Sequence, residues 1–266
     1  MKVEKVTLPT RLRALARTRA SGLLLLVALL ALWEVSAAAG WVRSDNWPRF
    51  SSILQALISG LRSGELAVVL GTTLYRMTVG FASGTLVAVF MGVMLGRFRL
   101  ADEALRPVLE VLRTLPSPAI VPPLILLLGV DDALKIVTVA LAAFAPVFVN
   151  TYAGVRRLDE TLALTAKTFG LGSASTVWRI VLPSSVPAIA AGMRVSLALS
   201  LIVTVIAEMV SGSSGVGYYL LSMQFAMRAA DMYAAIVCLA LAGYVINLAF
   251  LLAEKRVLHW YVRNEN

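Results

Sequence analysis

Long apolar runs alternate with short polar segments along this chain. A helix that crosses a bilayer needs about 20 mainly apolar residues, and six runs are long enough: Ser21–Gly40, Leu66–Gly96, Val108–Val130, Ala133–Val155, Ala188–Ser211 and Met232–Ala253. The second run is long enough to tilt or to project beyond the bilayer. The third contains four prolines and is expected to be bent. The pattern predicts an all-α membrane protein with six transmembrane helices.

A shorter segment between the first two runs has an amphipathic pattern. Within Pro48–Gly64, apolar residues recur at the spacings of one helix face: Ile53, Leu54, Leu57, Ile58 and Leu61. This periodicity predicts a short helix that lies along the outer face of the membrane.

The composition agrees with a membrane protein. Of 266 residues, 59% are apolar and 15% are charged, and the mean hydropathy is +0.83, whereas soluble chains average about 25% charged residues. The single cysteine, Cys238, excludes a disulfide within the chain and a multi-cysteine metal site. We expect neither a metal site nor catalytic residues in this chain.

The net charge of +9 comes mainly from basic residues in the segments outside the spans, and their distribution indicates the orientation of the spans. With a cytoplasmic N-terminus, 16 Lys and Arg residues fall in the inner segments and five in the outer ones, which are Arg43, Arg49, Arg62, Lys135 and Arg228. Such a bias is typical of membrane proteins with both termini in the cytoplasm. The positive charge therefore needs no nucleic acid as a partner.

The first run has an alternative interpretation. The basic region before it and the small residues Ala37–Gly40 are compatible with a cleaved signal peptide. The run is longer than a typical signal-peptide core, however, and five remaining spans would place the termini on opposite sides. We therefore expect it to be retained as a span.

The loop at about residues 156–187 contains a polar insert with helix signals. Asp159 is a good N-cap, and Gly170 stands where a left-handed residue would end the first helix. Ser173 can cap a second short helix, while Pro183 and Pro187 are expected to prevent smooth continuation into the fifth span. The pattern predicts two short helices hinged at the glycine.

The apolar face of this insert, which includes Trp178, has two possible roles. It can rest on the lipid interface as an amphipathic segment with an aromatic anchor. It can also dock a cytoplasmic partner, because a rigid aromatic within an apolar patch is typical of interface cores. The pattern alone leaves both open.

The end of the insert resembles a known motif. Gly170, nine further residues and then Ile180-Val181-Leu182-Pro183 resemble the EAA loop of the membrane permeases of ATP-binding-cassette (ABC) importers. The leading Glu-Ala-Ala of that motif is replaced by Leu164-Thr165-Ala166, so a role for the glutamate does not carry over.

The resemblance extends over about residues 50–255. It is carried by Ser83–Gly96, Leu112–Pro116 followed by Val121–Leu124, Phe144–Gly154, and Val205–Met209 followed by Gly215–Tyr218. These segments look like the nitrate, sulfonate, taurine and bicarbonate permease subfamily. The resemblance implies the MetI-like fold of type I importers, with a cytoplasmic segment at 1–20, a transmembrane permease domain at 21–255 and a cytoplasmic tail at 256–266.

The resemblance also implies partners and a location. Two permease copies, as a homodimer in the bacterial inner membrane, would enclose the route of a small anionic solute. A binding protein outside the cytoplasm would deliver the solute, and two cytoplasmic ATPase subunits would bind ATP and Mg. This chain lacks a Gly-x-x-x-x-Gly-Lys-Ser/Thr phosphate loop, so we expect it to be no enzyme and to hold no cofactor. The residues implied in ATPase coupling are Leu164, Thr165, Ala166, Phe169, Gly170, Trp178, Ile180, Leu182 and Pro183.

Charged residues within the predicted spans are a further signal, because they are costly there and by default suggest function. The functional candidates among them are Arg76, Arg113, Arg194 and Glu208. Each is a candidate for lining the transport pathway or for pairing between helices. Arg113 and Arg194 lie near the cytoplasmic ends and can snorkel to the interface.

The glycine-rich segment Ser211–Tyr219 also has open interpretations. It suits an outer gate, a contact for the binding protein, or a flexible re-entrant turn. A serine hydrolase is disfavoured, because the only histidine, His259, is predicted on the opposite side of the membrane. An ATP-independent secondary transporter is the alternative function.

Overall fold

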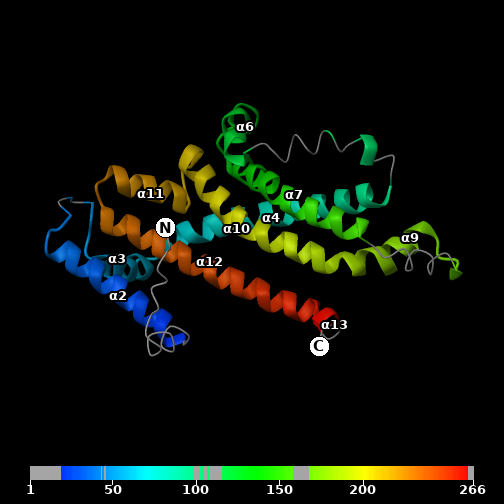
Figure 1. Ribbon diagram of the computed structural model, residues 1–266. Helices are drawn as coiled ribbons and strands as arrows, with labels where there is room; N and C mark the ends of the chain where they lie inside the picture. Colours follow the sequence, from blue (N-terminus) through cyan, green and yellow to red (C-terminus); the bar gives the residue numbers. More distant parts are fainter. Residues whose placement is uncertain are drawn as a thin grey trace, which may run out of the picture.

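The computed structural model describes residues 19–42, 44, 46–98, 102–104, 107, 116–157 and 168–262, and all regular structure within them is helical. By length and composition, four helical stretches can cross a membrane. They are α4 (Glu65–Arg97), α7 (Asp132–Arg156), the stretch Ser173–Ser211 with α10 (Leu182–Ser211) at its end, and α12 (Ala229–Val257) (Figure 1). They coincide with the second, fourth, fifth and sixth predicted runs.

The other two runs form shorter apolar helices within the described residues. The first run forms α2 (Arg19–Ala38). The described part of the third run forms the 3₁₀ turn η1 (Ser117–Ile120) and α6 (Val121–Leu128), while residues 108–115 lie outside the described residues. Prolines at the first turns of η1 and α6 explain the break, because proline suits a helix start and interrupts a helix interior.

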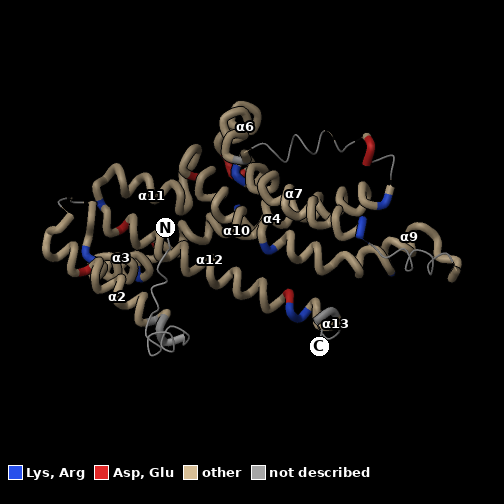
Figure 2. Tube along the Cα trace, viewed as in Figure 1, with Lys and Arg blue, Asp and Glu red and all other residues tan. Residues whose placement is uncertain are grey.

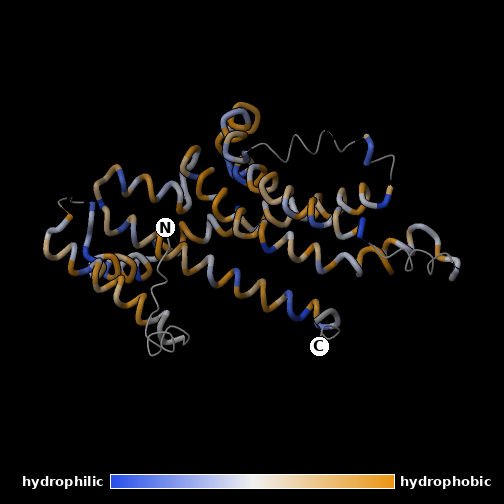
Figure 3. The backbone as a smooth tube through the Cα atoms, viewed as in Figure 1, coloured by the Kyte–Doolittle hydropathy of each residue, from blue (hydrophilic) through white to orange (hydrophobic). Residues whose placement is uncertain are grey.

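The hydropathy of the surface fits a lipid environment. Apolar residues predominate along the long helices, interrupted by a few hydrophilic positions (Figure 3). Several large apolar side chains point outward, among them Val68, Leu86 and Leu126, which are 70%, 74% and 87% exposed. A soluble protein rarely exposes so much contiguous apolar surface.

Helices α4 and α7 run parallel and make the most extensive helix contact in the described structure. Small residues recur every fourth position along α4: Gly80, Gly84, Ala88, Gly92 and Gly96. An added Cβ at the first of these would lie 2.6 Å from Val139, and at the last 2.7 Å from Val155. The same offset at both ends shows the parallel register. Such small-residue stripes let helix backbones approach closely in membranes.

Gly84 makes the tightest approach in this stripe, and we expect Gly84→Ala to destabilise the protein. An added Cβ would lie 2.2 Å from the carbonyl oxygen of Ala140, a backbone atom that moves only with α7. Overpacking of this kind costs about 1–3 kcal/mol, so the unfolding temperature in detergent should fall by several degrees. Gly71→Ala is the control, because nothing lies within 4 Å of a Cβ there. Equal unfolding temperatures for the two variants would contradict the packing described.

Helix α10 packs against α7 in the opposite direction. The Ser196 hydroxyl donates to the carbonyl of Ala143 at 3.0 Å. Toward the other end of the contact, a Cβ added at Gly154 would lie 2.7 Å from Ala188. Helix α7 is therefore held between α4 and α10, and these three helices form the centre of the molecule.

The expected break before the fifth span is wrong. Helix α9 (Ser173–Thr176), the π-turn η2 (Val177–Val181) and α10 follow one another without interruption, so Ser173–Ser211 is one helical stretch of 39 residues. In the wider turn, the Leu182 N–H donates to the carbonyl of Val177, five residues back. Pro183 falls in the first turn of α10, where a missing N–H is tolerated. Pro187 lies inside the helix without ending it.

The predicted amphipathic helix is confirmed as α3 (Phe50–Arg62), which buries Ile53 and Leu57. It packs beside α12, and its apolar face joins a core with residues of α11 (Val216–Phe225). The preceding α2 is attached to it by tryptophans: Trp33 donates to the carbonyl of Pro48 at 3.0 Å and stacks on Trp47.

The helix bundle has two ends. The α11 end carries α3, α11 and the starts of α4, α7 and α12 (Figure 1). The α9 end carries α9, α13 (His259–Val262) and the opposite ends of the same long helices.

Candidate functional site

The predicted coupling segment lies at the α9 end. Gly170 has a φ of +65°, the left-handed conformation expected of a residue that ends a helix. Phe169 beside it and Trp178 on η2 are 77% and 72% exposed. Of the motif ending, Ile180 and Leu182 are partly buried and Pro183 is exposed, while Leu164, Thr165 and Ala166 lie outside the described residues. The segment thus presents two large apolar side chains at a bundle end.

The predicted charges Arg76 and Glu208 meet in a buried ion pair. Arg76 on α4 is 2% exposed, and Glu208 near the end of α10 is fully buried. The Arg76 Nη1 donates to Glu208 Oε1 at 2.7 Å, and the Thr73 hydroxyl donates to Glu208 Oε2 at 2.9 Å. A buried carboxylate needs such partners, because an unpaired one would carry a large desolvation penalty.

Arg76 also reaches Asp132, which the sequence pattern does not single out, and Ser214 of the glycine-rich segment. Its Nε donates to Asp132 Oδ1 at 2.8 Å, at the start of α7. Its Nη2 donates to the Ser214 hydroxyl at 2.7 Å, and Nη1 donates to the Ser214 carbonyl at 2.9 Å. One guanidinium therefore ties α4 to α7, to α10 and to the segment before α11. Figure 2 shows basic and acidic residues together near the junction of α6 and α7.

The glycine-rich segment after Glu208 is held by the same pair. The Gly217 N–H donates to Glu208 Oε2 at 3.0 Å, and the Val216 N–H donates to the Thr73 hydroxyl at 2.8 Å. Gly215 has a φ of +95°, and an added Cβ would lie 2.2 Å from the Glu208 carboxylate. Glycine is therefore required there for both conformation and space. Hydrogen bonds fix the start of α11 against α4 and α10.

The other two predicted intramembrane charges are separate from this cluster. Arg194 on α10 forms an ion pair with Glu254 on α12 toward the α9 end, and its side chain is about half exposed. Arg113 lies outside the described residues. A similar ion pair joins Arg156 to Asp102, which also accepts a hydrogen bond from Tyr152.

An apolar cleft of about 1070 Å³ opens on the middle of α7 and α10. Helix α7 contributes Phe144 and Asn150, α10 contributes Ile202 and Ile206, and η1 closes one side with residues that include Ile120. Its size is at the upper end of the range of small-molecule sites. No Lys, Arg, Asp, Glu or His is among the described residues that line it.

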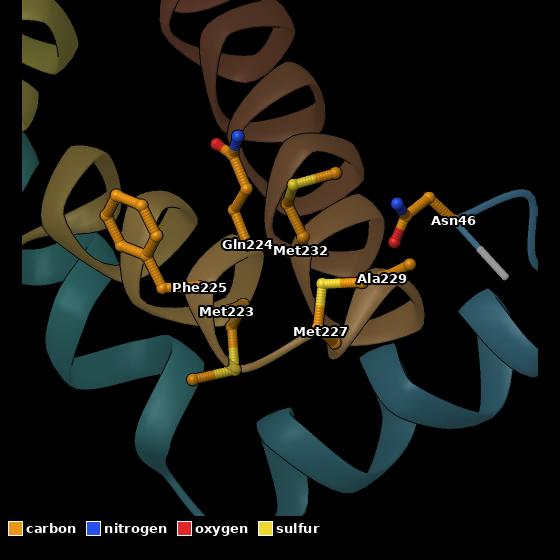
Figure 4. Close-up of a pocket in the computed structure, with 7 residues that line it drawn as sticks. All are labelled: Asn46, Met223, Gln224, Phe225, Met227, Ala229 and Met232. Atoms are coloured by element: carbon orange, nitrogen blue, oxygen red, sulfur yellow. The ribbon is translucent and has the colours of Figure 1, made fainter.

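A second hollow, of about 520 Å³, lies at the turn between α11 and α12. Figure 4 shows Met223, Met227 and Met232 around it, together with Asn46 and Phe225. Met227 is the one non-glycine residue with a positive φ, +55°, in the described part of the chain. Phe225 and Met227 are largely exposed. Methionine side chains adapt to different partners because they are flexible and polarisable.

The sequence did not indicate that Thr73 and Asp132 contact these charges, and it indicated Ser214 only as part of the glycine-rich segment. Asp132 falls at a predicted span boundary, where a charged residue is ordinary, and the others are common residues in apolar helices or turns. The available signal was the number of hydrogen-bond donors on Arg76. A buried arginine has five N–H donors, so acceptors besides one glutamate were to be expected near it.

The chain is similar to known transport proteins. Residues 84–259 match the family described as "Binding-protein-dependent transport system inner membrane component". The putative aliphatic sulfonates transport permease protein SsuC of Bacillus subtilis is 32% identical over 90% of this chain and 87% of that protein. The taurine transport system permease protein TauC of Escherichia coli is 24% identical over 89% of this chain and 88% of that protein.

The fold also has solved counterparts. An inward-facing structure of the MetNI methionine ABC transporter superposes with a TM-score of 0.62 at 16% identity, over 70% of this chain and 93% of that one. This likeness shows the MetI-like fold and nothing about the solute. The family match and the similar permeases confirm the predicted subfamily and an inner-membrane location. The chain belongs to the family of inner-membrane permease components of binding-protein-dependent ABC transport systems.

Proposed function

We propose that this chain forms half of the transport route of an ABC importer for a small anionic solute. An organic sulfonate is the favoured solute. The similar proteins SsuC and TauC are named for aliphatic sulfonates and for taurine, and taurine is itself a sulfonate. Nitrate, bicarbonate and aromatic acids are the other candidate solutes of the subfamily. A second copy of the chain completes the route, with the cleft on α7 and α10 facing it.

The continuous helical stretch Ser173–Ser211 is the observation that carries this proposal. It has the exposed Trp178 near one end and the buried Glu208 near the other. At 1.5 Å per residue, 39 residues extend about 58 Å. A continuous helix of this length would transmit a displacement of the coupling segment past the cleft to the α11 end. Two ATPase subunits that grip Trp178 and Phe169 in each copy would thereby move the walls of the route.

The six-span topology is part of the proposal. Helices α4 and α7 are parallel, so the chain must return from the α9 end to the α11 end between Arg97 and Asp132. A third span within residues 108–130 provides that return, and α2 is the first span. Both termini and the segment at 156–187 then lie in the cytoplasm, in agreement with the positive charge there. The domain limits proposed are 1–20, 21–255 and 256–266.

The α11 end is then the outer face, where a solute-binding protein docks. Its exposed Phe225 and Met227, beside the hollow of Figure 4, offer an apolar and adaptable surface for that contact. ATP and Mg belong to the ATPase subunits in this proposal, and this chain holds no cofactor.

Uptake by reconstituted liposomes tests the proposal. The chain, its ATPase subunits and its binding protein should take up an alkanesulfonate only when ATP is supplied on the ATPase side. Uptake by this chain alone, without ATP, would instead show a secondary transporter.

The same assay tests the role of the rigid helix. The double variant Arg179→Gly/Ser184→Gly changes two exposed positions. It should lower the free energy that stabilises the helical conformation there by about 2 kcal/mol. We expect the ATPase to co-purify and to hydrolyse ATP, while uptake falls several-fold. The control is Arg179→Ala/Ser184→Ala, which removes the same side chains and keeps the helix. Equal uptake by both double variants would show that coupling does not require a rigid helix.

A further inference from the structure

The cleft on α7 and α10 has an almost entirely apolar wall. All side chains that line it within the described residues are aliphatic, aromatic, proline or alanine, with Asn150 as the one that can form hydrogen bonds. Phe144 and Ile202 supply large apolar surfaces on opposite helices. The charged cluster around Arg76 and Glu208 is buried elsewhere and contributes nothing to this wall.

Asn150 is held in a defined position. Its Nδ2 donates to the carbonyl of Pro146 at 2.9 Å, one turn earlier on α7. On the other side the α10 backbone lies against it, since a Cβ added at Gly192 would be 2.9 Å from the Cβ of Asn150. The side chain is partly exposed to the cleft. An amide nitrogen carries two donors, so the second N–H is available to a solute.

On the basis of the proposed function, we propose that Asn150 is the hydrogen-bond donor to the anionic head of the solute and that the surrounding apolar wall takes up its carbon chain. The site therefore selects organic anions over small inorganic ones. Burial of each methylene group favours binding by about fourfold, whereas an inorganic anion such as nitrate has no carbon chain to bury and gains nothing from the wall.

A neutral donor also suits a transport route. Conduction requires binding that is favourable enough for entry and weak enough for release. A lysine or arginine in an apolar cleft would hold a sulfonate by a charge-assisted pair in a low dielectric. A single amide N–H orients the anionic head group by one hydrogen bond and still permits its release.

The experiment measures protection of a cysteine in the cleft. Ile202 lines the cleft and is 55% exposed, so Ile202→Cys in a Cys238→Ser background provides one reactive thiol. The complete transporter in liposomes is labelled with a neutral maleimide in the presence of methane-, ethane- or butanesulfonate, or of nitrate at equal ionic strength. We expect the sulfonates to slow labelling and nitrate to have no effect. The sulfonate concentration needed for protection should fall up to about fourfold for each added methylene group.

The role of Asn150 is tested in the same background. Asn150→Leu keeps the approximate size and removes the donor, and should raise the protecting concentration of butanesulfonate about tenfold or more, as expected for a lost hydrogen bond to a charged group. Asn150→Asp should abolish protection, because a carboxylate repels the anion. Asn150→Gln should restore part of it. The control, Gln55→Leu on the exposed face of α3, removes an amide far from the cleft and should leave protection unchanged.

The possible outcomes separate this inference from the proposed function. If wild-type transporter takes up sulfonate with ATP but Asn150→Leu leaves uptake and protection unchanged, the inference is wrong and the proposed function stands. If Asn150→Leu instead changes the permease from dimer to monomer, measured by light scattering, a second copy fills the cleft and the inference is also wrong. If no organic anion is taken up with ATP, both fail.

Discussion

Glu208→Ala is expected to give the largest loss of stability of any single substitution considered for this protein. The variant removes a fully buried carboxylate from Arg76, Thr73 and the Gly217 N–H at once. Breaking a buried ion pair by removal of one partner costs about 3–5 kcal/mol, and the buried Arg76 then keeps only the half-exposed Asp132 as a counter-charge. We expect a large drop in the unfolding temperature of the purified permease, measured by intrinsic fluorescence in detergent or nanodiscs.

An exposed ion pair provides the control. Arg228 Nε lies 3.0 Å from Asp231 Oδ2, and the Arg228 side chain is 54% exposed. Asp231→Ala should therefore cost below about 1 kcal/mol. The double variant Arg76→Met/Glu208→Leu removes both charges and should recover part of the loss. An unfolding temperature of Glu208→Ala within a degree of that of Asp231→Ala would contradict the description of the cluster as a stabilising centre.

Trp178→Ala is expected to weaken docking of the ATPase strongly. The indole is 72% exposed near the end of a continuous helical stretch, and tryptophans at the centre of interfaces often contribute 2 kcal/mol or more. Such a loss weakens affinity about 30-fold, since 1.4 kcal/mol corresponds to a factor of ten. The measurement is co-purification of the ATPase subunit with the affinity-tagged permease, with uptake recorded in parallel.

Trp41→Ala is the matched control for this variant. Its side chain is 66% exposed but lies near the end of α2 at the α11 end, away from the coupling segment. The ATPase should co-purify with it as with the wild-type protein. If Trp178→Ala also retains the ATPase, the segment rests on lipid as an amphipathic anchor, which is the other interpretation of its sequence pattern.

The prediction of individual elements succeeded where a local pattern decides the structure. The period of Ile53 and Leu57 predicted α3, and uninterrupted apolar runs predicted α4, α7 and α12 within a few residues. The left-handed Gly170 was predicted because few other residues adopt that conformation readily. In each case the free energy depends on neighbours within one or two turns.

The prediction failed at Pro183 and Pro187, where proline was expected to break the helix. The surrounding structure keeps the helix continuous there. A proline removes one N–H and clashes with the preceding turn, which predicts a break. The π-turn at Val177–Val181 precedes Pro183, and contacts of α10 with α7 hold the helix beyond it. The continuous stretch therefore depends on packing that no single-sequence rule includes.

By itself the sequence determined the class of protein, the positions of most helices and the segment that resembles the ABC coupling loop, because hydrophobic length, helical period and motif spacing are properties of consecutive residues. Only the tertiary structure decided which charges meet and which side chains share a wall. Arg76 and Glu208 are 132 residues apart in sequence, and the cleft places Asn150 among side chains from η1, α6, α7 and α10. Contacts of this kind arise when helices pack, and the glycine stripe that brings α4 against α7 sets the positions at which they form.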